Sequence, residues 1–421
     1  MKFQAVKGVR DILPPESALW NRVEQAAREV FAAYGYGEIR LPIFETTELF
    51  ARSIGADTDV VAKEMYTFED RDDTSVTLRP EATASGVRAY IEHGMHTRPG
   101  NVKLYYIGPM FRRERPQKGR YRQFYQIGVE LLGPSDHPAL DAEVIEMLMV
   151  FFERIELKGT VLSLNSIGDK ECRPKYVETL RGALQKVRDK LGPDSQRRIE
   201  ANPLRVLDSK LAEEQPIIEK LPRIAEHLCD ACRDHYAELK RQLGLRGIAY
   251  QENWRLVRGL DYYMRTTFEV TATGLGSQDA VCGGGRYDGL VELLGGPAGT
   301  KGIGFAIGTD RVILSLEQGS EAKPQGGIEV YLAWMGAAAY PAAVALAQKL
   351  RRQGTSVELP AVEMKFGKSL NLADRLGARY AVILGDDELA AKQFTVKRLA
   401  DGDQKKLSEP DLLTYLLPRT Q

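Results

Sequence analysis

The stretch from residue 111 to residue 130 carries the residue types best suited to binding a phosphate. From Arg112 to Arg122, six of eleven residues are basic, one is acidic, and arginine outnumbers lysine five to one. Arginine contacts phosphate through two parallel hydrogen bonds, whereas lysine acts as a point charge. The composition therefore favours a phosphate-binding loop over the structural alternative, a solvated hairpin tip.

Polar residues occupy one face of the strand predicted to follow that loop. Because side chains alternate along a strand, this face carries Phe124, Gln126, Gly128 and Glu130. The other face is apolar and suits a core, with Tyr125, Ile127, Val129 and Leu131. A buried amide and carboxylate cost stability unless something pairs with them. We expect a ligand that stacks on Phe124, approaches over Gly128 and offers a hydrogen-bonding or cationic group to Glu130.

Two further segments have residues suited to a binding site. In residues 77–83, Pro80 ends a strand and begins a helix with Glu81 in its first turn. The alternative for Glu81 is simple stabilisation of the helix dipole. Residues 256–268 are followed by residues 282–290, where three consecutive glycines allow a ligand close to the backbone. The glycines alone match neither a Walker loop nor a dinucleotide fingerprint.

The segment Gly302-x-Gly304-x-x-x-Gly308 resembles a dinucleotide fingerprint but has one residue too many before its last glycine. It predicts a strand that runs into a helix over residues 302–317. Arg311 lies in the first turns of that helix, where a cation opposes the helix dipole. We therefore interpret Arg311 as a phosphate ligand.

Cys229-x-x-Cys232, with His235 close behind, is the one segment that suggests a metal. A single CxxC without a second pair is a weak zinc signal. Its helical spacing favours a packed pair of cysteines, so we expect no structural zinc and no metal ligands here.

The predicted elements fall into three parts. Residues 1–165 mix helix and strand, with a helix over 16–33 and a hairpin of strands 104–112 and 123–132. The extended run over 39–44 contains Pro42, so we expect it at an edge or an interface and not in the middle of a sheet. Residues 167–250 have helical spacing, as in 175–191 and 217–243, and predict an inserted helical domain. Strand patterns return at 254–257, 266–271 and 279–282.

A linker composition covers residues 318–327. Beyond it, strands over 328–334, 356–359 and 380–384 alternate with helices over 341–353 and 368–376. Such alternation predicts a compact α/β domain with a largely parallel sheet.

Composition excludes several classes of protein. The chain has 421 residues with 58 basic and 58 acidic side chains, so it is not a polycation, although a local basic patch is allowed. Residues 330–348 are uncharged but contain Gly336 and Pro341, and a bilayer span needs about 20 apolar residues. The first ten residues lack the apolar core of a signal peptide. Four cysteines make no disulfide framework. We expect a cytoplasmic protein without a membrane contact.

Taken together, these motifs resemble class II aminoacyl-tRNA synthetases and, within them, the histidyl-tRNA synthetase family, over essentially the whole chain. Residues 35–42 resemble motif 1, residues 111–124 motif 2, and residues 302–311 motif 3. Residues 256–263 and 283–288 resemble two signatures peculiar to the histidyl family. The resemblance implies an α+β fold: an antiparallel-sheet catalytic domain (residues 1–166 and 251–320), a helical insertion domain (167–250) and a C-terminal α/β anticodon-binding domain (327–421).

The resemblance also implies a reaction and its residues. Histidine and ATP, with Mg²⁺, would form histidyl-adenylate, and the histidyl group would pass to the 3′ end of tRNA(His) in a cytoplasmic homodimer. The catalytic residues would be Arg258 and Arg112. ATP would contact Arg112, Glu114, Arg120, Phe124 and Arg311. Histidine would contact Glu81, Ala82, Thr83, Gln126, Glu130, Tyr262, Tyr263 and Tyr287. The tRNA acceptor end would contact Gln117 and Arg122.

Two alternatives come from other functional classes. A non-catalytic, histidine-sensing regulatory paralogue would keep the imidazole pocket but would not need Arg112, Arg258, Arg311 or a complete C-terminal domain. A bare RNA-binding protein would use the basic loop but would leave Gln126 and Glu130 unexplained.

Overall fold

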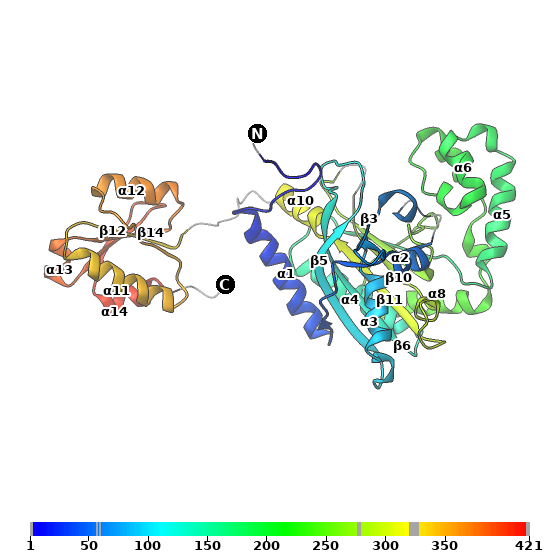
Figure 1. Ribbon diagram of the computed structural model, residues 1–421, viewed down its shortest axis with the longest axis horizontal. Helices are drawn as coiled ribbons and strands as arrows, with labels where there is room; N and C mark the ends of the chain where they lie inside the picture. Colours follow the sequence, from blue (N-terminus) through cyan, green and yellow to red (C-terminus); the bar gives the residue numbers. More distant parts are fainter. Residues whose placement is uncertain (1–2, 56–57, 59, 276–278, 320–327, 418–421) are drawn as a thin grey trace. The chain divides into compact units, whose positions relative to one another are not determined.

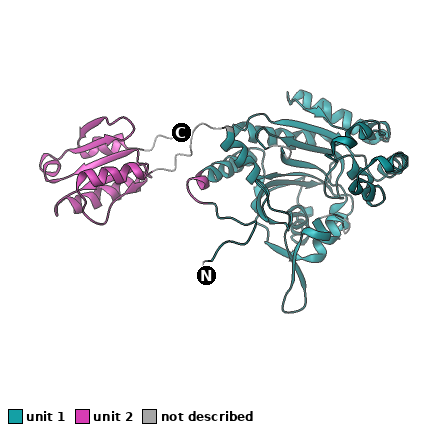
Figure 2. Ribbon diagram, turned by 90° about the horizontal axis from the view of Figure 1, so that it is seen from above, with its two compact units in different colours: residues 1–12, 19–321 teal, residues 13–18, 322–421 magenta. Residues whose placement is uncertain are grey.

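The computed structural model describes residues 3–55, 58, 60–275, 279–319 and 328–417. The chain divides into two compact units, residues 1–12 with 19–321 and residues 13–18 with 322–421 (Figure 2). No helix among the described residues is both long and apolar enough to cross a membrane. Residues 320–327 of the predicted linker lie outside the described residues.

A twisted sheet forms the centre of the first unit (Figure 1). Its strands among the described residues, in spatial order, are β1 (Gly37–Glu38), β5 (Val102–Phe111), β6 (Gln123–Gly133), β11 (Lys301–Gly308), β10 (Ala280–Arg286), β9 (Met264–Thr271), β7 (Val161–Ser166) and β8 (Gln251–Glu252). The two edge strands pair in parallel and the remaining pairs are antiparallel. The antiparallel sheet predicted for the α+β class is confirmed.

The predicted hairpin is formed by β5 and β6, which pair Tyr106 with Gly128 and Leu104 with Glu130. The extended run predicted over 39–44 is not one continuous strand, since only its last residue, Phe44, belongs to a strand. The chain leaves β1 at Glu38, and β2 (Phe44–Thr46) joins a separate small sheet with β4 (Ser75–Leu78) and β3 (Tyr66–Glu69). Between them, the buried Arg79 guanidinium donates to the carbonyls of Leu41 and Pro42, which therefore need no strand partner.

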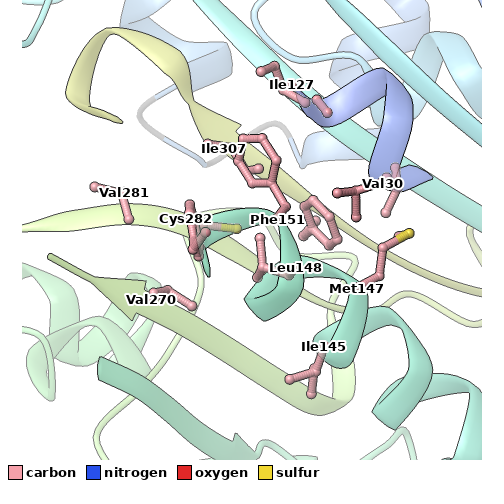
Figure 3. Close-up of a cluster of buried hydrophobic side chains, with 14 of the residues drawn as sticks. Val30, Ile127, Ile145, Met147, Leu148, Phe151, Val270, Val281, Cys282 and Ile307 are labelled. Atoms are coloured by element: carbon pink, nitrogen blue, oxygen red, sulfur yellow. The ribbon is translucent and has the colours of Figure 1, made fainter. Parts of the chain in front are cut away.

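Helices cover one face of the large sheet. They are α1 (Glu16–Ala33), α4 (Pro138–Arg154), α8 (Asp230–Leu245) and α10 (Thr309–Gly319). Figure 3 shows Val30 of α1, Phe151 of α4 and Ile307 of β11 in this core. Ile127, Val129 and Leu131 of β6 belong to the same core, as their alternation predicted. The polar face of β6 therefore turns away from these helices.

The inserted segment folds as helices around a second apolar cluster. It contains α5 (Arg173–Gln185), α6 (Pro193–Ala201) and α7 (Gln215–Ile218), and this cluster also includes residues of α3 (Thr83–Glu92) and α9 (Leu290–Leu293). The helix predicted over 217–243 is interrupted, since Pro222 lies between α7 and α8. Leu239 and Leu243 of α8 are part of the main core, not of this cluster. The remaining helix of this unit, α2 (Thr47–Ile54), packs on α3.

The strand predicted over residues 254–257 is wrong. These residues form a loop, and the Asn165 side chain donates hydrogen bonds to the carbonyls of Trp254 (3.2 Å) and Leu256 (3.0 Å). A side-chain amide thus satisfies the backbone groups that a strand partner would otherwise take.

The second unit is a five-stranded sheet, among the described residues, flanked by helices. The strand order is β13 (Val357–Glu358), β12 (Val330–Trp334), β14 (Tyr380–Leu384), β15 (Phe394–Arg398) and β16 (Gln404–Leu407). The helices are α11 (Ala339–Arg352), α12 (Phe366–Arg375), α13 (Asp386–Ala391) and α14 (Glu409–Tyr415). The predicted parallel pairing is confirmed for the three strands from which it was inferred, since β12 pairs in parallel with both β13 and β14. The two further strands were not predicted, and they add the antiparallel pairs β14–β15 and β15–β16. The connection from β15 to β16 is too short for a parallel crossover.

Candidate active site

A pocket of about 280 Å³ opens beside the polar face of β6. Its lining brings together distant parts of the first unit: the start of α3, the loop between β5 and β6, residues 258–263, and strands β9, β10 and β11. Predicted residues in the lining are Glu81, Thr83, Arg112, Glu114, Arg120, Phe124, Gln126, Arg258, Tyr262, Tyr263, Tyr287 and Arg311. The segments 77–83, 111–130, 256–268 with 282–290, and 302–311, which the sequence indicated for their chemistry, thus meet at one place.

Four arginines form a group that we call the arginine cluster: Arg112, Arg120, Arg258 and Arg311. Glu114 lies 3.1 Å from the guanidinium of Arg120 and 3.9 Å from that of Arg112. Arg311 donates to the carbonyl of Ala280 at 2.7 Å, and burial together with the nearby Arg120 cation lowers its pKa. Several cations in one partly dry pocket attract an anion with more than one negative charge, such as a polyphosphate.

Arg258 owes its position to the first of the three glycines. A side chain on Gly283 would overlap the Arg258 guanidinium, so the glycine makes room for a protein side chain that faces the pocket. The expectation that the glycines admit a ligand to the backbone is thereby corrected at this position. Nη1 of Arg258 pairs with Glu269 at 3.0 Å, while Nε is buried without a hydrogen-bond partner.

The ring of Phe124 faces one member of the arginine cluster, Arg112. The Arg112 guanidinium lies 5.4 Å from the centre of this ring, and Nε of Arg112 donates to the carbonyl of Pro80. Arg112 is therefore held by backbone on one side and by an aromatic face on the other. A flat base that enters the pocket finds an aromatic plate beside a cation.

A second group, which we call the buried acid–tyrosine cluster, comprises Glu81, Glu130, Tyr106, Tyr262, Tyr263 and Tyr287. Burial raises the pKa of Glu130 to about 8, and Glu130 accepts a hydrogen bond from the Tyr287 hydroxyl. Burial also raises the pKa of Glu81, whose carboxylate accepts from the backbone N–H groups of Thr83 (2.6 Å) and Ala84 (3.0 Å). Glu81 thus stabilises the start of α3, which is the structural role considered above as the alternative to ligand binding. Its side chain also faces the pocket.

Gln126 has an unmet hydrogen-bonding requirement. Its Oε1 atom is buried and has no hydrogen-bond partner, although the residue lines the pocket. An unpaired buried amide oxygen costs free energy until a donor reaches it. The unpaired Gln126 oxygen therefore indicates a ligand that carries an N–H or O–H group.

The approach of a ligand over Gly128, which the alternation along β6 predicted, is wrong. The ring of Tyr106, across the hairpin, occupies the space where a Gly128 side chain would stand. Glycines of β11 serve the same purpose: Gly302 makes room for Tyr287, and Gly304 for the Glu130 carboxylate. Missing side chains in these strands accommodate protein groups of the buried cluster.

The remaining predicted residues lie outside the pocket lining. Ala82 is the N-cap of α3, and Glu130 is 2% exposed behind Tyr287 and Gly304. Gln117 pairs with Arg120 at the tip of the hairpin loop. The Arg122 side chain contacts the backbone of Lys7, and its N–H donates to the carbonyl of Gly8.

Sequence reasoning missed Glu269 and Tyr106, which both line the pocket. Glu269 alternates in β9 with Phe268 and Val270, which are part of the core. The period-two argument that selected Glu130 would have selected Glu269 as well. For Tyr106, the signal is tertiary, because its place is set by the register that pairs it with Gly128.

The cysteine pair Cys229 and Cys232 does have a second pair of potential metal ligands beside it, which the sequence did not reveal. The structure brings Asp169 and Cys172 to these two cysteines. His235 takes no part, since its Nε2 atom contacts the carbonyl of Asp136 at 3.1 Å.

Comparisons with known proteins agree with this geometry. The family profile described as histidyl-tRNA synthetase matches residues 8–312, and that described as an anticodon binding domain matches residues 329–419. Proteins described as histidine–tRNA ligase from Solibacter usitatus (strain Ellin6076) and Koribacter versatilis (strain Ellin345) are 54% and 53% identical over 414 and 424 residues, which cover 98% of this chain in both cases and 99% and 96% of theirs. The apo histidyl-tRNA synthetase of S. aureus aligns with a TM-score of 0.80 at 38% identity over 99% of this chain and 100% of its own. The chain therefore belongs to the histidyl-tRNA synthetase family.

Proposed function

We propose that this chain activates histidine with ATP and transfers the histidyl group from the adenylate to the 3′ end of tRNA(His). The observation that carries the proposal is one pocket lined by the arginine cluster and by the buried acid–tyrosine cluster, whose Glu130 lies directly behind the Tyr287 hydroxyl of the lining. The first suits a polyphosphate and the second a small ligand with several hydrogen-bonding groups.

The first step is an in-line displacement at the α-phosphorus of ATP. The carboxylate of histidine attacks, the bond to the bridging oxygen breaks, and diphosphate leaves. Negative charge grows on the phosphoryl oxygens, so positioned cations matter more than a proton-transfer residue. Arg112 and Arg258 stabilise that charge, and the buried, unpaired Nε of Arg258 is a donor ready for it.

The amino acid is recognised by the buried cluster. Glu81, Thr83 and Gln126 bind its backbone groups, with Ala82 supporting the start of α3. Glu130 and Tyr263 read the imidazole, and Tyr262 and Tyr287 complete the wall. A site built from hydrogen-bonding groups rejects ligands that lack the matching donors, because its own buried groups would then stay unpaired.

ATP is held by the arginine cluster. Arg120 and Arg311 bind phosphates, and adenine stacks on Phe124 against Arg311. Mg²⁺ prefers oxygen ligands and combines one or two carboxylates with substrate phosphates. Glu114 and Glu269 lie among the arginines and suit this role, where the ion neutralises phosphate charge.

The tRNA contacts lie outside the pocket. Gln117 and Arg122 of the hairpin loop meet the acceptor end. The unit that contains residues 328–417 meets the anticodon, in agreement with the description of its family profile.

A cytoplasmic homodimer completes the proposal. Ile43, Phe44 and Phe68 are 46–53% exposed, and the rings of Phe44 and Phe68 lie 6.5 Å apart. These apolar residues adjoin the segment that resembles motif 1 and are suited to a subunit interface.

Amino-acid-dependent ATP–diphosphate exchange with all twenty amino acids tests the proposal. We expect exchange with histidine alone, followed by charging of tRNA(His). Absence of exchange, with histidine still bound in calorimetry, would instead support the histidine-sensing paralogue. The curated relatives support the ligase and not that regulatory alternative.

A further inference from the structure

Four metal-ligand side chains meet where the inserted segment joins the sheet. One ligand atom each of Asp169, Cys172, Cys229 and Cys232 lies within 4.8 Å of all the others. The Cys172 sulfur is 3.5 Å from Oδ1 of Asp169, and the Cys229 sulfur is 3.9 Å from the same oxygen. Ligands of a tetrahedral zinc ion with metal–sulfur bonds of about 2.3 Å lie about 3.8 Å apart. The cluster already has nearly these dimensions.

Two short turns of the same design supply the ligands. Asp169-x-x-Cys172 precedes α5, and Cys229-x-x-Cys232 begins α8 with Cys229 as its N-cap. In the first turn, Gly168 has a positive φ of 67°, and the backbone N–H of Asp169 donates to the Cys172 sulfur at 3.4 Å. Structural zinc sites commonly have two pairs of ligands, and the two ligands of a pair are commonly separated by two residues. The two turns are about 60 residues apart in sequence, so only folding unites them.

The surroundings suit a negatively charged metal centre. Three thiolates and one carboxylate around Zn²⁺ leave a net charge of −2. Arg265 lies beside the cluster, with Nη2 3.5 Å from Asp169 Oδ2. A cation at this distance offsets part of the charge. Cys229 is partly exposed while the other three ligands are buried, which leaves a path for the ion.

Without a metal, the four residues make only weak contacts with one another: the thiols of Cys172 and Cys229 donate long hydrogen bonds to the Asp169 carboxylate. Oδ1 of Asp169 accepts hydrogen bonds from the N–H groups of Glu171 (3.0 Å) and Cys172 (3.3 Å), so Asp169 stabilises its own turn. That role does not account for three sulfur atoms at the same point. The whole chain has four cysteines, and three of them converge here.

We propose that Asp169, Cys172, Cys229 and Cys232 bind one structural zinc ion. The site fastens the start of the insertion to α8, whose Leu239 and Leu243 belong to the main core.

The site also adjoins the candidate pocket. Arg265 exchanges backbone hydrogen bonds with Ile167 and Gly168, the residues just before Asp169. Arg173, just after Cys172, donates to the carbonyl of Tyr263 at 2.5 Å. The zinc ion therefore stiffens the chain segment that holds a tyrosine of the buried cluster.

The first test is metal analysis of the full chain, made without a polyhistidine tag and purified without chelators. We expect about one zinc per chain by mass spectrometry. X-ray absorption should give three sulfur ligands at about 2.3 Å and one oxygen at about 2.0–2.2 Å. Cobalt, added to chain freed of zinc, should give the intense visible bands of tetrahedral cobalt–thiolate.

Variants assign the ligands. Cys232→Ser and Asp169→Asn should lose the zinc, whereas Asp230→Asn should keep it. Asp230 is a matched control because its carboxylate lies between the two cysteines in sequence, is 89% exposed and is outside the cluster. If Cys232→Ser fails to fold, the X-ray absorption and cobalt spectra of the wild type still show whether three sulfur atoms and one oxygen bind the metal.

Three results would overturn the proposal: a wild-type chain that holds no zinc and takes up no cobalt, a disulfide between Cys229 and Cys232 in freshly purified protein, or full zinc content in Cys232→Ser. None of these results depends on whether the chain charges tRNA.

Discussion

The arginine cluster and the buried acid–tyrosine cluster share one pocket but hold their charges in opposite ways. Arg120 and Arg258 remain 41% and 21% exposed and pair with Glu114 and Glu269. Glu130 is 2% exposed, and its partner is the neutral hydroxyl of Tyr287. Guanidinium groups stay charged and attract an anion, whereas burial raises the pKa of Glu130 to about 8 and favours its neutral form. In our proposal the arginine cluster accelerates adenylation, and the buried acid–tyrosine cluster selects histidine.

The largest effect should follow from removing one member of the arginine cluster. We expect Arg258→Ala to lower the single-turnover rate of adenylation at least ~100-fold, because one positioned electrostatic stabiliser is lost. Arg112→Ala should lose as much. Arg255→Ala is the control, since Arg255 pairs with Glu219 away from the pocket. A loss below about threefold in Arg258→Ala would remove its catalytic assignment.

A smaller effect is expected in the buried cluster and should fall on binding. Glu130→Gln keeps the shape of the side chain but cannot offer a carboxylate to the imidazole. Hydrogen bonds to charged groups contribute about 1.5–3 kcal/mol, so the KM for histidine should rise about 10- to 100-fold. Steady-state exchange measures this, with the exposed Glu92→Gln as control. A fall in kcat with an unchanged KM would contradict the division between the two clusters.

Phe124→Ala tests the same division of roles in the part of the pocket proposed to bind ATP. Stacking of a base on an aromatic ring contributes about 1–3 kcal/mol, so we expect a rise of about 10-fold in the KM for ATP. The KM for histidine should change little. Tyr125→Phe, one residue along on the core face, keeps its ring and should behave as wild type. Equal changes in both KM values would show that Phe124 acts through the shape of the whole pocket.

A separate effect, on stability and not on catalysis, should appear as a dependence on pH. In the folded chain the pKa of Glu130 is about 8, against an ordinary value of 4.5. Between these values the folded chain keeps a proton that the unfolded chain releases, so the free energy of unfolding falls as pH rises. Glu130→Gln removes this dependence. In calorimetry without ligand, its Tm should therefore match that of wild type below pH 4.5 and exceed it above pH 8. A gap independent of pH would refute the raised pKa.

Much of the pocket was predictable because its pattern is local. The alternation in residues 123–133 separates core from site, and the arginine-rich loop beside it indicates a phosphate. Glu269 follows from the same rule. The errors arose where contacts are distant: a strand over 254–257 was expected, but Asn165, far earlier in the chain, takes its carbonyls.

The faces of the strands, the charge of the loop and the resemblance to the family follow from the amino-acid sequence, because periodicity and composition act over a few residues. The positions of Tyr106 over Gly128 and of Arg258 over Gly283 depend on the folded chain. Folding alone joins Asp169 and Cys172 to Cys229 and Cys232. Each of these contacts links segments that are distant in the chain or depends on strand register, and no local pattern specifies such a meeting.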